Sequence, residues 1–115
     1  MGITNTDALQ AACAFDADAA APAFFSQTGF SGFVRNGAGD YTLTLDRPYV
    51  SASRAPVILA SLSGPQSLAA SNKISAFFAS ANTIRVNTLQ SNESVDPVTG
   101  ALADVDFNLL VVALT

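Results

Sequence analysis

The 115-residue sequence contains no histidine, no tryptophan and a single cysteine, Cys13. Without histidine the chain has neither the commonest general base near neutral pH nor a Ser-His or Cys-His nucleophile pair. A zinc site of the usual Cys/His kind is also excluded. One cysteine allows no intrachain disulfide, and its apolar neighbours predict that Cys13 is a small core residue. We therefore predict a non-enzymatic protein with no catalytic, cofactor-binding or metal-binding residue.

Charged residues are scarce as well, at 12% of the chain, against about 25% in an average soluble domain. The basic residues are scattered singly: Arg35, Arg47, Arg54, Lys73 and Arg85. A surface that follows nucleic-acid phosphates needs such residues in a cluster, so we expect no direct nucleic-acid partner. Because no apolar run reaches the roughly 18 to 20 residues of a spanning helix, we expect no membrane partner either.

Two pairs of carboxylates remain as candidates for chemistry, Asp16 with Asp18 and Asp104 with Asp106. Residues spaced i, i+2 share one face of a strand, and two acids can serve glycoside hydrolysis or hold calcium. The simpler interpretation is that these are solvated acids where strands begin. A sugar cleft is normally lined with aromatics, and apart from phenylalanine this chain has two tyrosines.

The aromatic residues are mostly phenylalanine, eight against two tyrosines. Phenylalanine has no polar group, so we expect these side chains to anchor a core or an interface. Only Tyr41 and Tyr49 combine a ring with a hydroxyl that can meet a sugar.

A hairpin is the clearest local pattern, at residues 32–46. A Gly-Ala-Gly-Asp turn at 37–40 is followed by Tyr41, Leu43 and Leu45, which alternate with threonines. This period of two is typical of a half-buried strand.

From residue 24 onward, short apolar segments end at Gly, Pro, Asn or Ser. They predict strands at 24–27, 30–35, 41–45, 57–62, 73–79, 83–88 and 106–114. Strands of this spacing predict an all-β fold, an antiparallel β-sandwich formed by residues 24–115. The polar stretches 61–72 and 90–102 are expected to be exposed loops, and 90–102 a mobile one.

Residues 1–23 allow more than one interpretation. The alanine-rich segment predicts a short helix capped by Thr6, but the alternation through residues 9–15 also fits a strand with a linker ending at Pro22. A third possibility, which we favour, is an N-terminal arm or linker that lies on a neighbouring subunit.

Two predicted strands, 57–62 and 107–114, are apolar on both faces. In an antiparallel sheet this pattern means that the outer face is covered too. A sandwich has one interior, so we expect a second copy of the chain to cover these strands. The alternative is an edge strand covered by the N-terminal segment.

The order of features from residue 30 to 114 resembles a β module of tailed-bacteriophage virion proteins. The resemblance rests on the Gly-Asp-Tyr-Thr-Leu-Thr-Leu segment at 39–45, on Pro48 and on Asp-Val-Asp-Phe-Asn-Leu-Leu-Val at 104–111. It implies a jelly-roll or C1q-like sandwich that forms a homo-oligomer, with a trimer favoured.

This resemblance also implies a function. With only a short segment before the module, the chain is most similar to a capsid decoration or cement protein that binds the major capsid protein. Such a protein is made in the host cytoplasm and resides on the capsid surface of the virion. The alternative is a fibre tip that binds a receptor or glycan through the stretches at 61–72 and 90–102.

Overall fold

The structure is a computed structural model in which residues 9–18, 20–47, 56–63, 73–92 and 96–112 are described. Within these ranges the chain forms nine strands: β1 (Leu9–Asp16), β2 (Ala23–Thr28), β3 (Phe30–Gly37), β4 (Asp40–Leu45), β5 (Val57–Leu62), β6 (Lys73–Phe78), β7 (Thr83–Asn92), β8 (Asp96–Leu102) and β9 (Phe107–Val112). Every pairing is antiparallel. The predicted all-β sandwich is confirmed.

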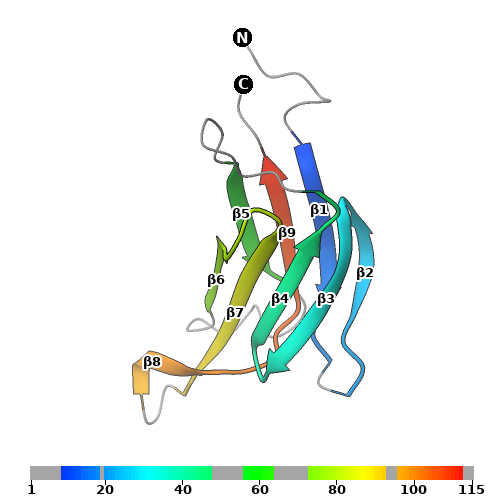
Figure 1. The fold of residues 1–115 in the computed structure, drawn as a ribbon. Helices are drawn as coiled ribbons and strands as arrows, with labels where there is room; N and C mark the ends of the chain where they lie inside the picture. The colour runs from blue at the N-terminus through cyan, green and yellow to red at the C-terminus, as the bar shows by residue number, and fades with distance from the viewer. Residues whose placement is uncertain (1–8, 19, 48–55, 64–72, 93–95, 113–115) are drawn as a thin grey trace.

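The strands form two sheets that pack face to face (Figure 1). The first sheet has the order β2-β1-β9-β5, and the second has the order β3-β4-β7-β6 with β8 beside β7. None of the described residues forms a helix long and apolar enough to cross a membrane.

The core lies between the sheets and follows the alternation of the strands. In β4, Tyr41, Leu43 and Leu45 are buried, whereas the threonines between them are half-buried. Phe15 of β1 stacks on Phe107 of β9 at 4.9 Å between ring centroids and meets Tyr41 across the interior at 5.1 Å. Alternating apolar residues on both sheets thus form one closed interior.

The predicted hairpin at 32–46 is confirmed, with β3 and β4 joined at Ala38 and Gly39. Gly39 has a φ of 64°, a region that favours glycine. A Cβ at this position would lie 2.6 Å from the backbone nitrogen of Ala103. Glycine is therefore required here both for the turn and for the close approach of the connection before β9.

The N-terminal arm proposed for residues 1–23 is wrong for Leu9–Asp16, which is the strand β1. It lies inside the first sheet, hydrogen-bonded to β2 on one side and β9 on the other. Three of its alternate side chains enter the core, with Ala11 and Phe15 fully buried and Cys13 nearly so. Alternation therefore prevailed over the helix propensity of alanine, because the strand gains a place in the core. Residues 1–8 lie outside the described residues.

The segment 90–102 is also not the loop expected from its turn-forming residues. β7 continues to Asn92, and Asp96–Leu102 returns as β8 beside it. In Figure 1 this hairpin projects beyond the end of the two packed sheets. The stretch 61–72 begins as the end of β5, and most of it lies outside the described residues.

Candidate functional site: the outer face of the first sheet

Strands β5 and β9 expose large apolar side chains on the outside of the first sheet. Leu59 is 54% exposed, Val57 44% and Leu110 40%. Their neighbours in sequence point inward, since Leu109 and Val111 are buried and Ile58 is packed against the core. Both faces of these strands are therefore apolar, as the sequence predicts, and in the single chain the outer face stays open to solvent.

The strand registers align the outward side chains in two rows across the sheet, because directly paired residues share a face. One row runs from β2 to β5 through Thr28, Ala12, Leu110 and Leu59. The next row runs in the same direction through Ser26, Ala14, Asn108 and Ser61. Val112 and Val57 form a further apolar pair beside the first row. We call these ten residues the uncharged face.

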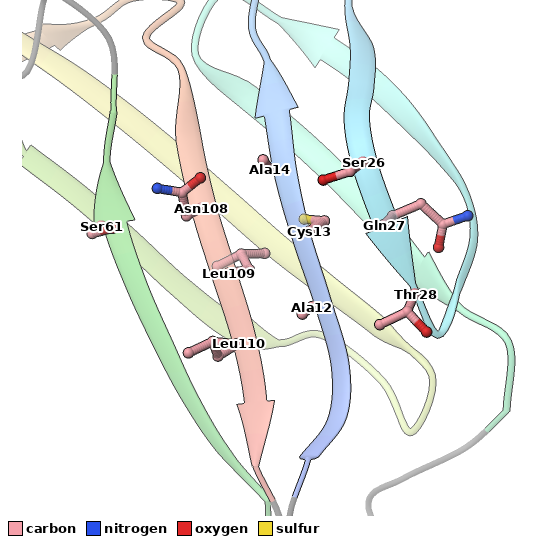
Figure 2. Close-up of a pocket in the computed structure, with 10 residues that line it drawn as sticks. All are labelled: Ala12, Cys13, Ala14, Ser26, Gln27, Thr28, Ser61, Asn108, Leu109 and Leu110. Atoms are coloured by element: carbon pink, nitrogen blue, oxygen red, sulfur yellow. The ribbon is translucent and has the colours of Figure 1, made fainter.

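An open groove of about 650 Å³ crosses the uncharged face. Figure 2 shows its floor, where the short side chains of Ala12 and Ala14 on β1 lie between β2 and β9. Ser26 and Thr28 border it on the β2 side, and Leu110 borders it on the β9 side. A smaller hollow of about 120 Å³ lies between β9 and β5. The surface thus has a low half over β1 and β2 and a high half over β9 and β5.

None of the residues of the uncharged face carries a charge, and the next outward residue of β1 after Ala14 is Asp16, at the turn to β2. Cys13, the sequence neighbour of the two alanines, has its side chain in the core. Burial raises the pKa of the Cys13 thiol to about 12, and a backbone hydrogen bond at Leu109 opposes that rise only in part. The thiol is thus un-ionised at neutral pH, and the predicted core role is confirmed.

The outer face of the second sheet differs, because it carries an ion pair. Asp40 of β4 accepts two hydrogen bonds from the Arg85 guanidinium of β7, from Nε at 2.5 Å and from Nη2 at 2.6 Å. These bonds lower the pKa of Asp40. Partial burial acts in the opposite direction, and a hydrogen bond from Asn36 lowers the pKa further. Thr42 of β4 is paired with Arg85 of β7 on one side and with Val34 of β3 on the other. We call this surface the charged face.

Asp104 forms a second charged cluster, at the end of the sandwich near the β3–β4 turn. Its carboxylate accepts hydrogen bonds from Arg35 Nη2 at 2.7 Å, from the backbone N–H of Gly39 at 3.0 Å and from the Tyr41 hydroxyl. Burial by itself would raise the pKa of Asp104. The hydrogen bonds together outweigh burial and lower the pKa, and the bond from Arg35 contributes most to this lowering. Burial and the adjacent carboxylate raise the pKa of Tyr41. We call these four residues the Asp104 cluster.

The two predicted carboxylate pairs do not act as pairs. Asp106 lies before β9 rather than in it and accepts the Ala17 N–H at 2.8 Å, whereas Asp104 bonds to the β3–β4 hairpin. Asp16 and Asp18 each accept a backbone N–H two residues ahead. All four carboxylates thus hold backbone segments in place, and no cluster of three or more metal-ligating side chains occurs among the described residues.

Of the two tyrosines that could meet a sugar, Tyr41 is not accessible. Tyr41 is fully buried, with its ring against Phe15 and Phe107, and Tyr49 lies outside the described residues. The phenylalanines follow the expectation of anchors, since Phe15, Phe30 and Phe107 are core residues. Others are exposed on the surface, Phe25 at 65% and Phe77 at 52%.

Sequence reasoning missed the groove itself. It identified the apolar outer side of β5 and β9 but did not place Ala12 and Ala14 beside it. The signal was present in residues 9–15, where small alanines alternate with core residues. Only the pairing of β1 with β9 turns those alanines into the floor of a groove.

No protein-family model, curated protein or solved structure matches this chain.

Proposed function

We propose that this protein is a non-enzymatic structural protein of a virion, a jelly-roll-like or C1q-like subunit that decorates or cements a bacteriophage capsid. In this role it associates with copies of itself and with the major capsid protein. The resemblance of residues 30–114 to phage virion modules motivates the choice of capsid, and it implies a trimer as the assembly.

The observation that carries the proposal is the uncharged face. A continuous sheet surface with half-exposed Leu59, Leu110 and Val57 is costly to leave in water. Monomeric proteins rarely expose contiguous apolar patches larger than a few hundred Å², and patches above that size mark protein contacts. In an assembly, neighbouring subunits cover this surface and remove its apolar side chains from water.

The test is co-sedimentation of the purified protein with capsids of the phage whose genome encodes it. We expect saturable retention on capsids from which the endogenous protein has been removed, and no retention on DNA. A protein that stays in the supernatant with such capsids would contradict the capsid role.

A second candidate, a receptor-binding or glycan-binding module at a fibre tip, is supported by one specific feature. The rim of the groove carries hydroxyl and amide groups from Ser26, Thr28 and Asn108, which are suitable partners for sugar hydroxyls. No aromatic ring lines the groove, and this disfavours a sugar site. A glycan-array signal that disappears in Asn108→Ala would favour this candidate over the capsid role.

A further inference from the structure

The uncharged face is complementary to itself. Its β9–β5 half carries the large side chains Leu110 and Leu59, and its β1–β2 half carries the small Ala12 and Thr28 in the same row. We infer that a second copy of this chain packs face to face on the uncharged face, about a two-fold axis parallel to the strands between β1 and β9. This inference rests on the self-association within the proposed function and specifies its surface and symmetry.

The position of the axis follows from the shapes of the two halves. Rotation about an axis parallel to the strands places the high half of one copy over the low half of the other. Leu110 then faces Ala12 of the second copy, and Leu59 faces Thr28. A two-fold axis across the strands would instead oppose leucine to leucine and leave both grooves empty, which wastes the contacts of close packing.

The same axis also matches the polar side chains. Because it keeps each row opposite the same row, Asn108 faces Ala14 of the second copy and Ser61 faces Ser26. Sheets pack at about 10 Å, a gap that two serine side chains are too short to span with a direct hydrogen bond, so a water molecule would bridge Ser61 and Ser26. Polar groups that leave water at an interface need partners, and symmetry supplies this bridged serine pair twice.

The absence of charge on the uncharged face favours a second copy as the occupant, over a contact of modest area. A charged partner would lose hydration against the uncharged face and gain no ion pair there, whereas a copy brings the same neutral groups. Four strands about 4.8 Å apart and six residues at about 3.4 Å give a plane of roughly 400 Å². Contact over this plane buries roughly 800 Å² on the two copies together, which is the area of a weak, transient interface.

Face-to-face contact also decides the symmetry. When one patch meets the same patch, the contact is isologous and closes as a pair. A trimer needs two different patches on each copy, and the uncharged face offers only one. The geometry therefore favours a pair over the three copies implied by the resemblance.

The first test measures the mass of the purified chain by light scattering at about 100 µM, a concentration suited to a micromolar contact. We expect twice the 11.8 kDa of one chain. In Leu110→Lys an unpaired ammonium would enter the centre of the contact, and we expect dissociation at least about 100-fold easier. The control Val34→Lys, on the charged face at a position 58% exposed, should leave the pair intact.

The second test checks the register with opposite charges. We expect Leu59→Lys alone and Thr28→Asp alone to weaken the pair, because each charge faces a neutral residue. An equimolar mixture should recover the mass of a pair, since the lysine of one copy then faces the aspartate of the other. These two residues are at opposite edges of the sheet, and both are exposed, so neither change should disturb folding. Mixing could not repair a folding defect within either chain, so recovery of the pair would report the contact between the two charges.

Three results would overturn the inference: a single chain at 100 µM, a trimer, or a pair that Leu110→Lys does not weaken. The tests need no capsid, so they separate the two proposals. A pair that ignores capsids leaves this inference standing and contradicts the capsid role. A monomer that binds capsids would contradict this inference and leave the capsid role standing.

Discussion

The outer surfaces of the two sheets differ in charge and in side-chain size. The charged face of the second sheet carries the Asp40–Arg85 ion pair among threonines and asparagines. The uncharged face of the first sheet has alanines, leucines and hydroxyl groups in its place. Water solvates the ion pair of the charged face well, although that face also exposes Val34 and Phe77, whereas the uncharged face offers water no charged group. The same strand alternation therefore builds one surface suited to solvent and another suited to a protein neighbour.

The largest loss of stability is expected when a residue on the inner face of β9 is truncated, and the outer face of the same strand provides the comparison. Phe107→Ala removes a fully buried ring that stacks on Phe15, and we expect a loss of about 3–5 kcal/mol in the free energy of unfolding. Leu110→Ala, on the outer side of the same strand, should cost less than about 1 kcal/mol in a sample dilute enough to be monomeric. Urea unfolding of both variants measures the contrast. Equal losses would mean that Leu110 belongs to the chain's own core.

A second change makes the uncharged face resemble the charged one. Leu110 and Leu59 are directly paired across β9 and β5, so Leu110→Glu with Leu59→Lys places an ion pair on this surface. We expect self-association to weaken by at least about 100-fold, equivalent to about 2.7 kcal/mol, because two charges must lose water on contact.

The stability of that double variant is its internal control. Both positions are exposed, so the free energy of unfolding of the single chain should stay within about 1 kcal/mol of the original. Sedimentation velocity across a dilution series reports the association. An unchanged series would show that the two outer faces do not differ in function.

The Asp104 cluster should make folding sensitive to acid. The pKa of Asp104 is lowered in the folded chain, so its contribution is fully present above the unfolded carboxyl pKa of about 3.9 and is lost as pH falls through the lower folded value. Asp104→Asn keeps the shape but removes the charge. We expect it to cost about 1–3 kcal/mol at pH 7, because the Gly39 N–H and Arg35 lose a charged acceptor.

Unfolding of Asp104→Asn and the original chain at pH 7 and pH 3 tests the sign. The difference between the two proteins should shrink at the lower pH, where Asp104 of the original chain begins to take up its proton. A difference that grows in acid would contradict the lowered pKa.

The smallest effect is expected on the charged face. Arg85→Gln removes the partner of Asp40, but the arginine side chain is 40% exposed, and water replaces much of the interaction. We expect a small fall in the thermal midpoint, below that of Asp104→Asn, and a still smaller one in high salt. A fall as large as that of Asp104→Asn would mean that the charged face is structurally as important as the Asp104 cluster.

Much of the fold could be predicted from local patterns. The hairpin at 32–46 could be predicted because its turn residues and the alternating pattern that follows them indicate the same structure. The strand at 57–62 was found as a short apolar run closed by Ser-Gly-Pro, and the strand at 83–88 was found by its alternation, although β7 proved longer. β1 was ambiguous because alanine favours helix while the spacing of Leu9, Ala11, Cys13 and Phe15 favours strand. β8 was missed because Asp96, Pro97 and Gly100 are typical turn residues, and only its pairing with β7 makes it a strand.

The candidate site was predictable only in part. Apolar residues on both sides of 57–62 and 107–114 identified an outer surface that needs a cover. The groove could not be predicted, because it requires β1 to lie beside β9, a pairing across more than ninety residues of sequence. The pairs Asp16 with Asp18 and Asp104 with Asp106 were singled out by spacing alone, and spacing does not say which backbone N–H each carboxylate will meet.

By itself, the sequence determined the β class, the scarcity of charge and the absence of histidine chemistry, because these follow from composition and from a period of two. The tertiary structure alone decided that Ala12 and Ala14 lie beside Leu110, and that Asp104 closes on Arg35 and Gly39. Such neighbours are set by how distant strands pair, and pairing is chosen by the burial of the whole core rather than by any short segment.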